Sequence, residues 1–140
     1  MKKILVGYDD TDASKRALDR AVEIAKAFDA QVIVTSVAPL LHGTARSVGP
    51  VDPTDSPAMH EEQLRHAAEA LSAQGITPEL VPATGDPAGA IVRLADEMEA
   101  DLVVVGTREP GVVERLMHQS VSRKVAHHVH RDLLIVHHPH

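Results

Sequence analysis

A strand, a polar loop and a helix follow one another between residues 101 and 122. The apolar run at residues 102–105 stops at Gly106, a turn-prone loop comes next, and helical spacing resumes near Gln119. Open α/β sheets bind ligands beyond the carboxyl ends of their strands, often against a loop that leads into a helix. This loop is therefore the first candidate site, and phosphate binding is the chemistry that it would perform.

A second polar turn follows the first apolar run of the chain, at Asp9, Asp10 and Thr11. The carboxylate of Asp9 could contact a ligand at the carboxyl end of that strand. The same residue type also caps helices and turns the chain, because its oxygens accept backbone N–H groups. The sequence alone leaves both roles open for Asp9.

Composition narrows the classes of function. A chain of 140 residues suits one domain, which we place at residues 1–140. Hydrophobic residues make up 44% of the chain and aromatic residues only 1%, so we expect an aliphatic core. The absence of cysteine excludes disulfides and thiolate metal sites. A net charge of −6 argues against nucleic-acid binding, and no apolar run approaches the roughly 20 residues of a membrane span, so we expect a cytoplasmic protein without a membrane segment.

Apolar periodicity predicts five strands that alternate with helices, which is typical of an α/β fold with a parallel sheet and helices on both faces. We expect the open five-stranded order 3-2-1-4-5 in a single domain, with Phe28 on the inward face of the first helix. A proline- and glycine-rich surface loop is expected at 38–57. The expected strands are 4–8, 32–37, 76–81, 102–105 and 133–136; the expected helices are 12–28, one around 64–71, one from Asp86 to about Met98, and 119–128.

These pieces, in this order, resemble the universal stress protein family over essentially the whole chain. The resemblance rests on the opening strand with Asp9, on Gly85-Asp86-Pro87, on the fourth strand ending at Gly106, and on the last helix and strand. It implies a fold of the adenine nucleotide alpha hydrolase type. It also implies a stress-response protein, in which some members bind ATP and others do not.

Nucleotide-binding members of that family carry the motif Gly-x2-Gly-x9-Gly-Ser/Thr after the fourth strand. Here the first glycine and the last serine match, as Gly106 and Ser120, whereas Glu109 and Gln119 replace the other two glycines. A carboxylate repels phosphate, and a bulky amide fills space that glycine leaves to the backbone. We therefore expect no cofactor, with ATP as the alternative.

If a nucleotide does bind, the resemblance implies which residues surround it. Asp9 and Val37 would lie near the adenosine. The phosphates would lie among residues of the loop and of the last helix, namely Gly106, Arg108, Ser120, Val121 and Ser122. The bland alternatives are that Ser120 is only a helix cap and that Arg108 is a solvated loop residue.

No catalytic residue or metal site is predicted. The Gly-x-Ser-x-Gly and Gly-x4-Gly-Lys-Ser/Thr patterns of hydrolases and P-loop proteins are absent. Histidines cluster at His127, His128 and His130, and again at the end of the chain, but adjacent helical residues point in different directions. Adventitious metal affinity is the expectation for them.

The resemblance also implies a homodimer joined through the fifth strand, Leu133, Leu134, Ile135 and Val136. Physically, this apolar strand would form an edge of the sheet, and apolar edges are usually covered. The function expected from the sequence is a non-enzymatic, dimeric stress-response protein that acts on a protein partner still to be identified. The alternative is a nucleotide-dependent switch or weak ATPase.

Overall fold

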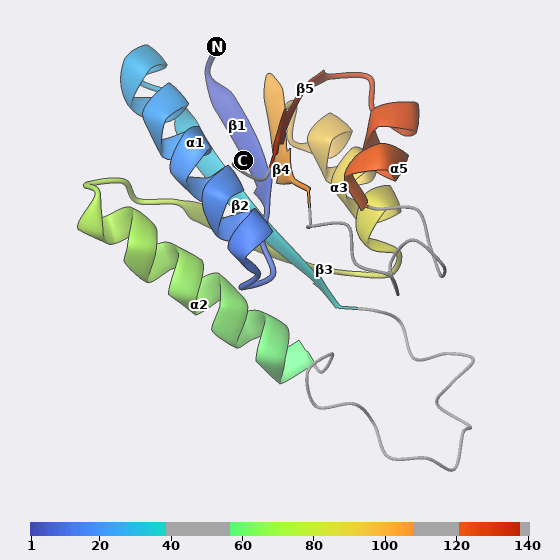
Figure 1. Ribbon diagram of the computed structural model, residues 1–140, viewed down its shortest axis with the longest axis horizontal. Helices are drawn as coiled ribbons and strands as arrows, with labels where there is room; N and C mark the ends of the chain where they lie inside the picture. The colour runs from blue at the N-terminus through green and yellow to red at the C-terminus, as the bar shows by residue number, and fades with distance from the viewer. Residues whose placement is uncertain (39–56, 108–120, 138–140) are drawn as a thin grey trace.

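Five parallel strands form one sheet in the computed structural model, which describes residues 1–38, 57–107 and 121–137 (Figure 1). The order β3-β2-β1-β4-β5 confirms the predicted topology. Each neighbouring pair is parallel, so all five carboxyl ends lie along the same edge. The strands are β1 (Lys3–Gly7), β2 (Gln31–Ala38), β3 (Glu79–Thr84), β4 (Leu102–Gly106) and β5 (Asp132–Val136).

Helices cover both faces of this sheet, as the alternating pattern predicts. Figure 1 shows α1 (Asp12–Phe28) and α2 (Pro57–Ala73) on one face, and α3 (Pro87–Glu97) and α5 (Val121–His128) on the other. Both helix starts agree with the sequence: Asp86 caps α3 with Pro87 in its first turn, and Thr11, in the polar turn that follows β1, caps α1. No helix of the described ranges has the length and hydropathy to cross a membrane.

The core is aliphatic and divided by the sheet into two layers. Successive residues of β1 alternate between them: Ile4 and Val6 pack with α1 and α2, and Leu5 packs with α3 and α5. Tyr8 is the aromatic member of the first layer and is only 5% exposed. Burial of both sheet faces explains why the strands read as continuous apolar runs rather than as alternating ones.

Two local predictions are wrong. The third strand was expected at 76–81 but runs from Glu79 to Thr84. Ile76 belongs instead to the turn after α2, where its N–H donates to the carbonyl of Leu71 and Gly75 has a left-handed φ of 82°. Phe28 is 58% exposed rather than inward, because the chain turns at Asp29 and Ala30 packs against the core.

The proline-rich segment expected at 38–57 is described only at its ends. Ala38 is the last residue of β2 and Pro57 is the first residue of α2. The expectation for the intervening residues 39–56 lies outside the described ranges.

Candidate functional site

The carboxyl edge of the sheet brings three of the predicted site residues together. Strand register pairs Gly7 with Thr35 and Val6 with Val104, so the chain leaves β1, β2 and β4 side by side. Asp9 follows β1, Val37 lies near the end of β2, and Gly106 ends β4. The predicted grouping of these residues at the carboxyl ends of the strands is therefore what the fold produces.

Asp9 turns the chain into α1. Its Oδ1 accepts the backbone N–H of Thr11 at 3.1 Å and the hydroxyl of Thr11 at 2.5 Å. Its own N–H donates to Oγ of Ser14 at 3.2 Å, and Ser14 in turn donates its N–H to the hydroxyl of Thr11. Of the two roles that the sequence allows for Asp9, ligand contact or chain turn, these hydrogen bonds show the chain turn. The carboxylate of Asp9 is half-buried and lies at the carboxyl edge of the sheet.

Gly106 has a packing role that needs no ligand. A Cβ atom built on Gly106 would lie 2.2 Å from the carbonyl oxygen of Ala13 and 2.6 Å from its carbonyl carbon. Any side chain at this position would therefore collide with the first turn of α1. The close approach of α1 to the end of β4 explains a glycine at this position of the motif without reference to phosphate.

A polar network that sequence analysis missed lies beside this edge, on the side of α1 and α2. Tyr8 is hydrogen-bonded to Asp10, and Oδ2 of Asp10 lies 2.9 Å from Nδ1 of His66 on α2. The pKa of the Tyr8 phenol is raised above its ordinary value, mainly by burial and secondly by the hydrogen bond to Asp10. The Asp10 backbone has a φ of 64°, a left-handed conformation that Asp tolerates.

A second missed network is almost fully buried and joins β2 to the first turns of α2. The hydroxyl of Ser36 donates to Oε1 of Gln63 at 2.6 Å, and Nδ1 of His60 lies 2.6 Å from the same hydroxyl. Because Ser36 has one proton to give and donates it to Gln63, Nδ1 of His60 is the donor to Ser36. Nε2 of His60 is buried without a hydrogen-bond partner among the described residues.

Sequence signals for these networks were weak. His60, Gln63 and His66 recur at a spacing of three along α2, which is visible in the sequence, but polar residues at that spacing ordinarily indicate a solvated face. Only the packing of α2 on β2 turns His60 and Gln63 inward, whereas His66 is exposed and reaches Asp10. Ser36, which lies in an apolar run and is 1% exposed, is the residue that makes the buried network necessary.

The universal stress protein family model matches residues 1–137. The chain belongs to this family. Among curated relatives of this universal stress protein, Rv1636 of Mycobacterium tuberculosis is 37% identical over 97% of the chain and 96% of the relative. The predicted resemblance is thereby confirmed over nearly the whole sequence.

Solved universal stress proteins share the fold. A universal stress protein in complex with cAMP is 33% identical, covers 97% of each chain and has a TM-score of 0.76. An Arabidopsis thaliana member with AMP bound has a TM-score of 0.68, covering 99% of this chain and 93% of its own. The latter is 16% identical, so its likeness shows the fold alone.

The remaining site residues of this universal stress protein lie on or before α5. Val121 begins the helix and Ser122 is 3% exposed, so Ser122 belongs to the packed surface of α5. Arg108 and Ser120 lie outside the described residues, as do Glu109 and Gln119, and their predicted roles stay predictions. Within the described ranges, no three His, Cys, Asp or Glu residues gather closely enough to hold a metal ion.

Proposed function

We propose that this universal stress protein acts without catalysis, as a homodimer joined through β5, in stress responses mediated by a protein partner. The cytoplasm is the location proposed with it. The observation that carries the proposal is the outer edge of β5, which no other strand of the described ranges pairs with and where Leu133, Leu134 and Ile135 are each only half-buried. An unpaired strand of apolar residues presents both hydrogen-bonding groups and side chains to another chain.

The two edges of the sheet differ in a way that supports this choice. At the other edge, β3 carries Pro82 within the strand, and a proline discourages pairing. Each edge strand begins with one carboxylate, but β5 has no proline and continues as four apolar residues from Leu133 to Val136. The edge that lacks a proline is the one expected to pair with a second copy.

The test is the mass of the purified protein by light scattering at micromolar concentration. We expect a dimer, and we expect Ile135→Lys to shift the mass toward the monomer because it buries a charge in the paired edge. Leu80→Lys, at a 39% exposed position of the opposite edge strand, is the matched control and should leave the dimer intact. A monomeric parent protein, or a dimer indifferent to Ile135→Lys, would contradict the proposal.

A second candidate function is binding of an adenosine nucleotide with a single phosphate. The specific observation in its favour is the relative in complex with cAMP, which is 33% identical to this chain over nearly its full length. Glu109 and Gln119 replace two of the glycines whose backbone N–H groups bind phosphate in the motif. This replacement disfavours a triphosphate more than a nucleotide with one phosphate, because a single phosphate needs fewer such groups. In this proposal Asp9 and Val37 flank the adenosine, as in the predicted alternative of an ATP- or AMP-dependent switch.

Calorimetric titration with cAMP, AMP and ATP with Mg²⁺ separates these candidates. If cAMP or AMP binds more tightly than ATP, the second candidate is supported. If none of the three nucleotides binds, the non-enzymatic dimer is the only one of the two candidates that remains. The double variant Glu109→Gly with Gln119→Gly should raise the affinity for ATP if these residues obstruct phosphate. Gly106→Val is unsuitable as a binding test, because its side chain would collide with Ala13.

A further inference from the structure

We infer that Asp132 of one subunit binds a cationic groove between α1 and β5 of the other subunit, and so sets the register of the dimer. The inference rests on the homodimer proposed above. It assigns to that dimer a pair of charged contacts, formed by Asp132 with Arg20 and supported by Arg16 one helical turn away.

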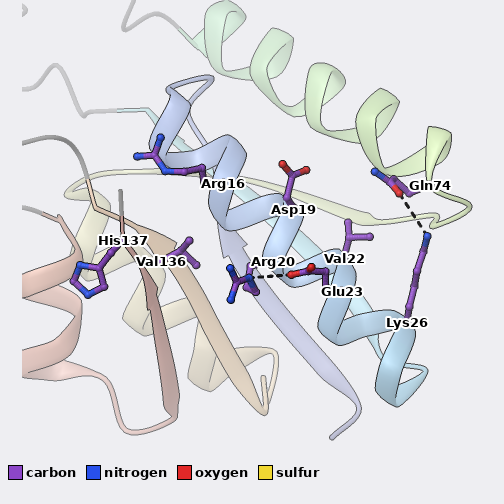
Figure 2. Close-up of a pocket in the computed structure, with 9 residues that line it drawn as sticks. All are labelled: Arg16, Asp19, Arg20, Val22, Glu23, Lys26, Gln74, Val136 and His137. Carbon is purple, nitrogen blue, oxygen red and sulfur yellow. Dashed lines mark hydrogen bonds and ion pairs between the residues drawn. The ribbon is translucent and has the colours of Figure 1, made fainter. Parts of the chain in front are cut away.

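The groove lies along the outer face of α1, and its volume is about 590 Å³. Figure 2 shows Arg16 and Arg20 on α1, with Arg20 directed toward the strand that carries Val136. Arg16, Arg20 and Lys26 line the groove against two carboxylates, Asp19 and Glu23. Three cationic and two anionic side chains give the groove a net positive charge, and His137 also lines it.

Strand alternation determines which side chains of β5 face this groove. Leu134 and Val136 pack in the core layer of α1, and Leu133 and Ile135 pack in the layer of α3 and α5. Because side chains alternate along a strand, Asp132 lies on the α1 side with Leu134 and Val136. Asp132 is exposed, and no other described residue forms an ion pair with it.

A two-fold axis through the middle of β5 then places the carboxylate. Pairing two copies of β5 in antiparallel orientation about Leu134 aligns all five residues, so Leu133 meets the partner's Ile135 and Asp132 meets the partner's Val136. Residues directly opposite each other in an antiparallel pair point to the same face. The partner's Asp132 therefore lies beside Val136 on the α1 side, where Arg16 and Arg20 line the groove. A shift of the register by one residue would turn the carboxylate to the other face.

The arginines have hydrogen-bonding capacity left for this contact. Nη2 of Arg16 makes only a 3.4 Å bond to the carbonyl oxygen of Thr107, so the guanidinium keeps donors for a supporting contact, whereas its Nε is buried and takes no part in it. Arg20 bonds Glu23 through Nε at 2.9 Å, with its side chain 55% exposed. A guanidinium has five N–H donors, so Arg20 can bind a second carboxylate while keeping the first.

Sedimentation equilibrium of the full chain tests the contact. Asp132→Arg and Arg20→Glu should each raise the dimer dissociation constant about tenfold, because the two-fold axis repeats each exposed ion pair and the substitution adds repulsion. The combination Asp132→Arg with Arg20→Glu restores opposite charges and should return the constant to near the parent value. Arg93→Glu, at an exposed position of α3 on the opposite face of the sheet, is the matched control of the same charge change and should leave the constant unchanged.

The outcomes distinguish this contact from the dimer itself. A parent dimer whose constant is unchanged in both single variants overturns the Asp132 contact and leaves the β5 dimer standing. The contact is likewise overturned if the combined variant is as weak as the single ones, because specific pairing requires rescue. A monomeric parent protein overturns the dimer and the contact together.

Discussion

Gly106 and Ala13 approach so closely that a side chain on the glycine would overlap the carbonyl group of the alanine. The distance from a Cβ built on Gly106 to the carbonyl oxygen of Ala13 would be 2.2 Å, which atoms in proteins do not adopt. The contact joins the end of β4 to the first turn of α1. The glycine that begins the family's phosphate motif is therefore also the residue that allows these two elements to pack.

Gly106→Ala is expected to destabilise the fold by about 2 to 3 kcal/mol, the upper part of the range for overpacked sites, because α1 must move to accept a methyl group. The measurement is urea unfolding followed by circular dichroism, in the absence of nucleotide. Gly75→Asn is the control, because a Cβ at Gly75 would meet nothing within 4 Å and Asn tolerates its left-handed φ. Equal stabilities of Gly106→Ala and the parent protein would show that α1 is not held against β4 as described.

The buried network of Ser36, His60 and Gln63 leads to a second prediction. Ser36→Ala should destabilise the protein by about 1 to 3 kcal/mol, because it leaves Nδ1 of His60 and Oε1 of Gln63 without the hydroxyl that they share. The loss would be read from the midpoint of urea unfolding at unchanged slope.

The control for that experiment replaces the whole network. Ser36→Ala combined with His60→Leu and Gln63→Leu removes all three polar groups, so it should be more stable than Ser36→Ala alone. If the triple variant is instead the weaker one, packing of the side chains rather than hydrogen bonding is what joins α2 to β2 there.

Tyr8 makes stability depend on alkaline pH. Its pKa is raised in the folded protein by burial and by the hydrogen bond to Asp10, so folding favours the protonated phenol. The stabilisation is complete below the ordinary tyrosine pKa of about 10 and is lost as pH rises above it, because the unfolded chain then releases the proton first.

The variant that tests this dependence is Tyr8→Phe. It should lower stability at pH 7 by about 1 kcal/mol, through the lost hydrogen bond, and should flatten the decline between pH 9 and about 11. Thermal unfolding across that range measures both effects. A parent protein and a variant that decline in parallel would exclude Tyr8 as the group responsible.

Strand order and element order were predictable from the sequence because burial of both sheet faces produces long apolar runs that are hard to mistake. Leu102 to Val105 is such a run, and it lies in β4 as expected. The third strand was misplaced because β3 is an edge strand with Pro82 and exposed residues, so its apolar signal is weak. Phe28 was misplaced because helical spacing continues to the last residue of α1 although the core does not.

The candidate site was predictable only as a location. Alternating strands and helices require Asp9, Val37 and Gly106 to meet at the carboxyl edge, whatever they bind. Their detailed roles depend on contacts between segments distant in the chain, such as Gly106 against Ala13, or Asp10 against His66. Sequence spacing carries no information about those contacts, which is why the two histidine networks on α2 were not foreseen.

Asp101 leads to a last prediction, at acid pH. Its Oδ2 accepts the backbone N–H groups of Lys2 and Lys3 at 2.8 and 2.9 Å, and these bonds lower the pKa of the carboxyl below its ordinary value. The contribution to stability is therefore present above about pH 4 and is lost as pH falls through the lowered pKa.

Asp101→Asn should be less stable than the parent protein at neutral pH, and the difference should shrink toward about pH 2.5 because the parent carboxyl is then increasingly protonated. Thermal unfolding between pH 7 and about pH 2.5 measures the difference, with Asp19→Asn on the exposed face of α1 as the control for loss of one negative charge. A difference that stays constant across this range would mean that the backbone of Lys2 and Lys3 is held by other contacts.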